Sequence, residues 1–157
     1  NQCRFSFMKN SQQVASNKKA FFNFEIVEKN EAGIVLTGCE IKSVRQGHVT
    51  IKESYVRIIN NELWLINCNI LPYSQGNRHN GNPARDRKLL IKKTEIKKLI
   101  GKTTQKGLVL VALSLYFKGS NLKVGFALAR PKKTHDKRQV LKDKALNREI
   151  QRSSKIR

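Results

Sequence analysis

The strongest constraint on the fold is a series of short apolar segments that alternate like β-strands and are separated by turn residues. The longest are residues 108–117, rich in Val and Leu, and residues 122–128, in which apolar residues alternate with small or polar ones. Gly119-Ser120-Asn121 between them is typical of a turn. This pattern predicts two strands joined by a turn.

A second strand pair is predicted earlier in the chain. Residues 55–59 and 63–66 flank Asn60-Asn61-Glu62, and asparagine accepts the positive φ that a tight hairpin turn requires. The segment 74–88 that follows is polar, contains Gly and Pro, and carries several basic residues. It is expected to be a long surface loop of the kind that is often functional.

Residues 21–47 are also predicted to form strands, with one helix. Residues 21–30 are expected to form a first strand, residues 31–33 a turn, and residues 34–36 a buried continuation. Ile41 and Val44 have helical spacing, so a short helix is expected to end at Gly47.

Another short helix is expected from Thr94, a favourable N-cap, to Gly101. The chain therefore has about six short strands and two or three short helices, without a βαβ rhythm. A closed antiparallel barrel removes the exposed edges of such strands. The expected fold is mainly β, a closed antiparallel oligonucleotide-binding-type barrel with a basic C-terminal tail.

The predicted domain organisation is one body with two appendages. Residues 1–16 are expected to be a disordered extension or one that depends on how the chain was produced, because the first 15 residues match no recognisable pattern and residues 1–24 contain no acid. Alternatives are a natural start at Met8 and the remnant of an organelle transit sequence. Residues 17–130 form the predicted barrel, and residues 131–157 the tail.

The charge of the chain points to an acidic partner. The formal net charge is +21 in 157 residues, with 32 Lys and Arg against 11 Asp and Glu. Nucleic acid is favoured over an anionic membrane. No apolar run approaches the roughly 20 residues of a membrane-spanning helix.

The tail concentrates this charge, with ten Lys or Arg against three acids. At about 100° per residue, five of its basic residues fall within an arc of roughly 80° on a helix. The apolar residues scatter around the same helix and provide no face for packing. The tail is therefore expected to be disordered in the free protein and helical against RNA, with a solvated basic tail as the alternative. The basic stripe consists of Lys137, Lys144, Arg148, Arg152 and Lys155.

The sequence contains no recognisable catalytic constellation. Three cysteines, an odd number without a close pair, argue against a disulfide framework and against zinc, as does the spacing of the histidines. Gly101-Lys102-Thr103 imitates the end of a phosphate-binding loop but lacks the preceding glycines. The acids are too scattered for a metal-dependent nuclease. No enzyme activity, cofactor or metal is expected.

Several segments, taken together and in order, resemble the small protein B family, the partner of transfer-messenger RNA in bacterial ribosome rescue. The match covers roughly residues 16–157. The segments are 17–20, 31–34, 38–45, 54–55, 72–78, 87–90, 99–102 and 132–138.

The resemblance implies a barrel that holds the tRNA-like part of that RNA. It implies delivery to the A site of a stalled ribosome with the GTPase elongation factor that carries tRNA, and a tail that probes the empty mRNA channel. The implied RNA-binding residues are Asn17, Lys18, Lys19, Glu31, Glu40, Lys42, Arg45, Arg87, Lys88, Leu90 and Lys123. The implied decoding-site residues are Lys132, Lys133, His135, Asp136, Lys137 and Arg138.

Two positions depart from the family pattern. Pro131 stands where related chains usually have Gly, and Phe22 where a His is common. The resulting hypothesis is a monomeric, non-enzymatic RNA-binding adaptor of trans-translation in the cytoplasm, or in the stroma or matrix of a bacterial-type organelle. The alternatives are a generic ribosomal or cold-shock-like RNA-binding protein and a small RNA-processing enzyme.

Overall fold

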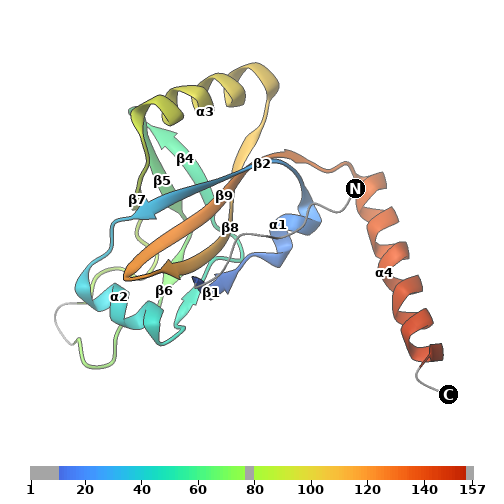
Figure 1. Ribbon diagram of the computed structural model, residues 1–157, viewed down its shortest axis with the longest axis horizontal. Helices are drawn as coiled ribbons and strands as arrows, with labels where there is room; N and C mark the ends of the chain where they lie inside the picture. Colours follow the sequence, from blue (N-terminus) through green and yellow to red (C-terminus); the bar gives the residue numbers. More distant parts are fainter. Residues whose placement is uncertain (1–10, 77–79, 155–157) are drawn as a thin grey trace.

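The computed structural model describes residues 11–76 and 80–154, which form a ring of antiparallel strands with helices outside it (Figure 1). The elements are β1 (Ser11–Ser16), α1 (Lys18–Asn23), β2 (Phe24–Ile34), α2 (Gly38–Arg45), β3 (Val49–Thr50), β4 (Tyr55–Ile59), β5 (Glu62–Ile66), β6 (Asn69–Ile70), β7 (Arg87–Leu90), α3 (Lys93–Lys106), β8 (Val109–Lys118), β9 (Asn121–Pro131) and α4 (Thr134–Ser154).

The strand order of the main sheet is β1-β8-β4-β5-β7-β2-β9, and β9 also pairs with β8. That last pairing closes six strands into a ring, so the prediction of a mainly β, antiparallel fold is confirmed. Helix α2 lies at the end of the ring beside the β8–β9 turn, and α3 lies at the opposite end (Figure 1). The described residues contain four helices, where two or three were expected.

The main core fills the inside of the ring. Alternate residues of the strands point inward, and Leu65, Leu115, Val124 and Phe126 are fully buried there. A smaller cluster lies outside the sheet, where Ala20 of α1 and partners from β8 and β9 are buried together. Residues 126–129 of β9 are therefore buried on both faces, although a half-buried strand was expected.

The structure corrects several predicted boundaries in the N-terminal part. Residues 11–16, expected within the N-terminal extension, form β1 and pair with β8, because Val14 and Ala15 pack against the core. Residues 21–23, expected in a strand, end α1. The turn expected at 31–33 is absent, since β2 stays paired with β9 up to Gly33. Residues 1–10 of the extension lie outside the described residues.

The helix expected to stop at Gly101 is longer. Helix α3 begins at Lys93 without a side-chain cap, so Thr94 is not its N-cap, and it ends at Gly107, whose φ is 56°. A glycine inside a helix costs only about 1 kcal/mol. The buried side chains of Ile96 and Leu99 hold this helix on the ring in spite of Gly101.

Other local predictions are confirmed. The 55–66 hairpin turns through Asn60 and Asn61, with φ values of 51° and 59°. Helix α2 starts with a capping box between Thr37 and Glu40, and its last turn leads to Gly47, whose φ is 80°. The expected loop ends slightly early, because Arg87 already begins β7.

Helix α4 extends away from the ring and touches it only near its start, beside α1 (Figure 1). The backbone N–H of Lys132 donates to Asn23 O at 2.9 Å, and its Nζ donates to Phe21 O at 3.2 Å. The structure thus has a helix where a disordered free tail was expected. Side chains 141–153 are all exposed, which agrees with the scattered apolar pattern. Among the described helices, none is long and apolar enough to cross a membrane.

Candidate nucleic-acid interface

The outer surface of the ring brings together three residues that the sequence marks for RNA binding. Leu90 in β7 pairs with Gly33 in β2, Gly33 with Lys123 in β9, and Lys123 with Tyr116 in β8. Leu90 is 54% exposed. Glu31 lies two residues before Gly33 and therefore on the same face. We call this surface the Glu31 face, and it consists of Glu31, Leu90, Tyr116, Lys118 and Lys123.

Glu31 is the acid of this face, and two side chains of β8 approach its carboxylate. The Tyr116 hydroxyl donates to Glu31 Oε2, and Lys118 Nζ lies 3.6 Å from Glu31 Oε1. Burial and the hydrogen bond to Glu31 raise the pKa of Tyr116, so that its hydroxyl stays protonated as a donor. The Glu31 side chain remains partly exposed, at 38%.

Helix α2 adds two exposed cations at the end of the ring. Lys42 Nζ lies 5.5 Å from the centre of the Tyr73 ring, and Arg45 Cζ lies 5.8 Å from that of Phe117. Phe117 belongs to the core inside the ring, so Arg45 lies over the end of the ring, beside the β8–β9 turn that follows Lys118 (Figure 1). Lys42 and Arg45 thus place positive charge at this end of the ring.

Glu40 of the same helix makes its hydrogen bonds and ion pairs within the protein. Its carboxylate accepts from Arg85 Nε at 2.8 Å, from Arg87 Nε at 3.0 Å and from the Thr37 backbone N–H at 2.9 Å. Burial by itself would raise the pKa of Glu40, but these hydrogen bonds and the Arg87 charge lower it to about 2. A carboxylate with these partners is a structural anion.

Arg87 is fully buried and completes this cluster. Its guanidinium donates to the carbonyl oxygens of Cys68 at 2.6 Å, Arg85 at 2.9 Å and Pro83 at 2.9 Å. Arg87 therefore fastens the loop before β7 to α2 and presents no charge at the surface. Lys88, the next residue, is partly exposed and paired with Glu62 of β5.

Asn17 is also buried, at the N-terminus of α1. Its Oδ1 caps the helix by accepting from Ala20 N at 3.0 Å, and its Nδ2 donates to Ala112 O at 3.0 Å. Its backbone N–H donates to Leu113 O at 2.7 Å. Along this edge of β8, β4 pairs with residues 110–111 and β1 with residues 114–118, so Asn17 fills the gap between them.

Replacing Asn17 by Ala is expected to lower the free energy of unfolding by about 1–2 kcal/mol through the lost cap, and more through the unpaired Ala112 carbonyl. Asn17→Ser keeps a hydroxyl that can cap the helix and loses the amide donor, without placing a charge at this buried site. Urea denaturation of both variants measures the two contributions. Equal stability of Asn17→Ala and the wild type would contradict the structural role.

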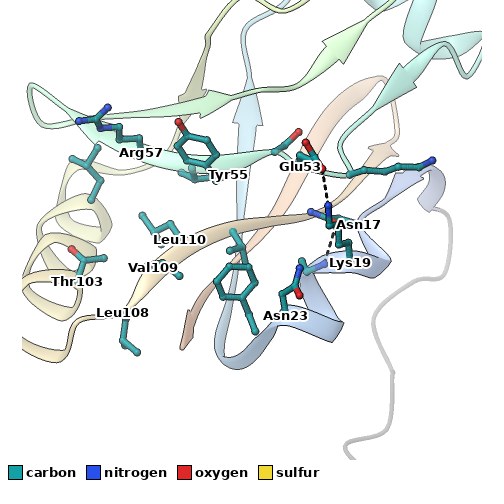
Figure 2. Close-up of a pocket in the computed structure, with 17 residues that line it drawn as sticks. Asn17, Lys19, Asn23, Glu53, Tyr55, Arg57, Thr103, Leu108, Val109 and Leu110 are labelled. Carbon is teal, nitrogen blue, oxygen red and sulfur yellow. Dashed lines mark hydrogen bonds and ion pairs between the residues drawn. The ribbon is translucent and has the colours of Figure 1, made fainter. Parts of the chain in front are cut away.

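A separate groove of about 710 Å³ lies between α1, β4 and β8 (Figure 2). Its walls are mostly apolar, with Tyr55, Leu110 and Val111 among them, and Lys19 and Arg57 lie at its margin. Lys19 is paired with Glu53 at 2.6 Å and is 58% exposed. Asn17 and Lys19 thus line this groove and do not join the Glu31 face, and Lys18 is exposed on α1.

The expected decoding-site residues lie together at the junction of β9 and α4. Lys133, Asp136 and Arg138 are exposed, and Lys132 and Lys137 are partly exposed. The His135 backbone belongs to the first turn of α4, but its side chain lies outside the described part of the structure, as does Lys155 of the basic stripe.

Within residues 11–76 and 80–154, no group of three or more His, Cys, Asp or Glu side chains could hold a metal ion. Burial raises the pKa of the Cys68 thiol to about 11, so this thiol stays protonated in the core.

Comparison with known proteins shows the family. The model of the SmpB protein family matches residues 14–156. The chain belongs to the SmpB family. It is 50% identical over 144 residues to the SsrA-binding protein of Carboxydothermus hydrogenoformans, covering 92% of this chain and 97% of that protein. It is 51% identical over 148 residues to the SsrA-binding protein of Halothermothrix orenii, covering 94% and 96%.

A solved structure matches as well. It is described as "tmRNA-SmpB: a journey to the center of the bacterial ribosome", and its chain shares 45% sequence identity and a TM-score of 0.63 with this one. The alignment covers 76% of this chain and 85% of that one. The ring of strands is therefore the SmpB fold.

Two residues of this SmpB-family site were not identified from the sequence. The sequence predicts Tyr116 either in the core or stacked on a base, and it predicts Arg85 only as one of the basic residues of the 74–88 loop. The alternation in residues 108–117 and 122–128 predicts strands but not their register, and that register places Tyr116 beside Glu31. Nothing in the sequence shows that Arg85 and Arg87 converge on Glu40.

Proposed function

We propose that this protein is an RNA-binding adaptor of trans-translation that binds the tRNA-like domain of transfer-messenger RNA and brings it to the A site of stalled ribosomes. One observation carries the proposal: in a member of the SmpB family, Glu31, Leu90 and Lys123 from three strands meet on one exposed face that α2 borders with Lys42 and Arg45. The ring serves as an oligonucleotide-binding-type barrel.

The residues implied in RNA binding divide by their surroundings. We propose that the exposed cations Lys42, Arg45 and Lys123 meet phosphates, that Leu90 gives apolar contact, and that Glu31 accepts hydrogen bonds from a base edge or a ribose hydroxyl. Lys18 and Lys19 add charge on the groove side, and Lys88 adds charge on β7. Three of the implied residues support RNA binding only indirectly, through the fold: Asn17, Glu40 and Arg87. Their side chains are buried or hydrogen-bonded to partners within the protein.

The tail is proposed to work on the ribosome. Residues 132–138 enter the decoding site, and the basic stripe of α4 faces the phosphates of the empty mRNA channel. The exposure of side chains 141–153 of α4 supports this role, because it leaves their charges accessible to RNA. The adaptor acts as a monomer without enzymatic activity, together with the tRNA-delivering elongation factor, wherever bacterial-type ribosomes are found.

The salt dependence of RNA binding tests this assignment. Each phosphate contact releases counterions, so the logarithm of affinity falls linearly with the logarithm of salt concentration. Replacing Lys42, Arg45 and Lys123 by Ala is expected to reduce that slope by about two to three, from about one per contact. Gel shifts at a series of salt concentrations from low to moderate measure this slope. Lys52→Ala, which removes a lysine on the groove side, is the control. An unchanged slope would place the RNA elsewhere.

The identity of the bound RNA distinguishes the alternatives. The protein recovered from bacterial extract is expected to carry one dominant structured RNA. A mixture of RNAs would favour a generic ribosomal or cold-shock-like protein, and processed fragments would favour an RNA-processing enzyme.

A further inference from the structure

Glu31 stands out electrostatically, because it is an acid on the surface proposed to bind RNA in a chain of net charge +21. A carboxylate opposes phosphate binding unless it accepts hydrogen bonds that only the right RNA can donate. Such hydrogen bonds require the carboxylate to point in one direction. Contacts that orient the Glu31 carboxylate therefore bear on which RNA the protein selects.

A side chain of strand β8 makes the contact that orients Glu31. Glu31 in β2 lies opposite Gly125 in β9, and Gly125 lies opposite Ser114 in β8. Tyr116, two residues beyond Ser114, reaches Glu31 with its hydroxyl. Tyr116 is 7% exposed, so its ring lies against the sheet and is not available for stacking on a base.

Gly125 leaves room for this arrangement. A β carbon at Gly125 would lie 2.7 Å from Ser114 Oγ and 3.5 Å from Tyr116 Cε1. The first distance is shorter than side chains tolerate. The absence of a side chain at Gly125 therefore makes room for Ser114, and the Tyr116 ring that reaches Glu31 passes within contact distance of the same position.

The contact leaves part of the carboxylate available. An ionised carboxylate offers about four acceptor positions, and the Tyr116 hydroxyl occupies one of them, on Oε2. Lys118 lies near Oε1 at 3.6 Å, beyond ordinary hydrogen-bond length. The remaining positions can accept from a pair of donors, such as a guanine edge or ribose 2′-hydroxyls.

We propose that Tyr116 is a positioning residue for RNA recognition: its hydroxyl fixes the Glu31 carboxylate so that the free acceptor positions face the RNA and discriminate the specific RNA from others. The inference rests on the proposed function. Tyr116 itself does not touch the RNA, and it acts through Glu31.

The test compares Tyr116→Phe, Glu31→Ala and the double variant in RNA gel shifts. Tyr116→Phe keeps the ring and removes only the hydroxyl. We expect the affinity for the tRNA-like RNA to fall about three- to tenfold, the range of one lost hydrogen bond. Affinity for a random RNA of equal length and the slope with salt should stay the same. In the Glu31→Ala background, Tyr116→Phe should have no further effect.

Tyr55→Phe is the matched control, since it removes a phenol hydroxyl on the groove side of the ring, and it should change neither affinity. Equal losses for both RNAs, additive losses in the double variant, or no loss in Tyr116→Phe would each overturn the inference. Thermal unfolding of Tyr116→Phe separates a loss of folded protein from a loss of recognition. If the wild type itself does not prefer the tRNA-like RNA, the proposed function fails, and the inference fails with it.

Discussion

Removing residues 131–157 is expected to abolish peptide tagging on stalled ribosomes while tight binding to the isolated tRNA-like RNA is kept. The ring does not need the tail, because α4 touches the body only beside α1 and its side chains from residue 141 onward are exposed. A chain ending at Arg130 loses one register pair, between Phe24 and Pro131, and the two hydrogen bonds of Lys132. The Glu31 face and α2 are left unchanged.

Two assays measure this separation, an RNA gel shift and tag transfer in a purified translation system. The triple variant Asp136→Ala, Lys137→Ala, Arg138→Ala should behave much like the truncation, because these residues are proposed to occupy the decoding site. Asn147→Ala, an exposed and uncharged position of α4, is the control and should tag normally. Normal tagging by the truncated chain would refute the proposed role of the tail.

Replacing Glu40 by Ala is expected to destabilise the fold by about 3–5 kcal/mol, because it leaves the fully buried Arg87 without its counter-ion. Domains of this size are stable by only about 5–15 kcal/mol. The variant should also bind RNA less well, since α2 carries Lys42 and Arg45. Glu40→Gln keeps one acceptor oxygen, replaces the other with an amide nitrogen and loses the charge. Its stability should fall between those of the wild type and Glu40→Ala.

The effect of Glu40 also has a pH dependence. Its pKa falls from 4.5 in a free carboxyl to about 2 in the folded protein. A lowered folded-state pKa contributes stability that is fully present above pH 4.5 and is lost as the pH falls toward 2. The difference in unfolding free energy between wild type and Glu40→Ala should therefore be constant near neutrality and shrink below about pH 4.5.

Urea denaturation at several pH values measures both effects. Glu53→Ala is the control, because Glu53 pairs with Lys19 at the surface, where both side chains are more than half exposed. It should not change stability measurably. If Glu40→Ala and Glu53→Ala are equally stable, the Arg85–Glu40–Arg87 cluster does not hold the loop.

Sequence patterns predicted the strands well where local rules and tertiary packing agree. Asn60-Asn61 favours a tight turn, and the apolar segments 108–117 and 122–128 both lie in strands, as predicted. Predictions failed where packing prevailed over local preference. Gly101 did not end α3 because Ile96 and Leu99 bury that helix on the ring. Residues 31–33 did not turn because β9 pairs alongside them.

The site was predictable as a set of residues but not as an arrangement. Resemblance to a family supplied the positions Asn17, Glu40 and Arg87 without their surroundings, and composition cannot distinguish a surface cation from a buried one. The structure shows the difference, since Arg87 is fully buried whereas Arg45 is exposed. A buried arginine needs hydrogen-bonding and charged partners, and for Arg87 these include residues far away in the sequence. A local sequence pattern cannot predict such partners.

The way the ring closes determines when this chain can fold during its own synthesis. β8 and β9 are the last strands made, yet they pair with β1 and β2, the first. The early strands β2, β4, β5 and β7 cannot enclose a core by themselves, and contacts so distant in sequence form slowly. Domains generally fold as units as the chain emerges. The nascent chain must therefore be translated through β9 before its hydrophobic interior is shielded from water.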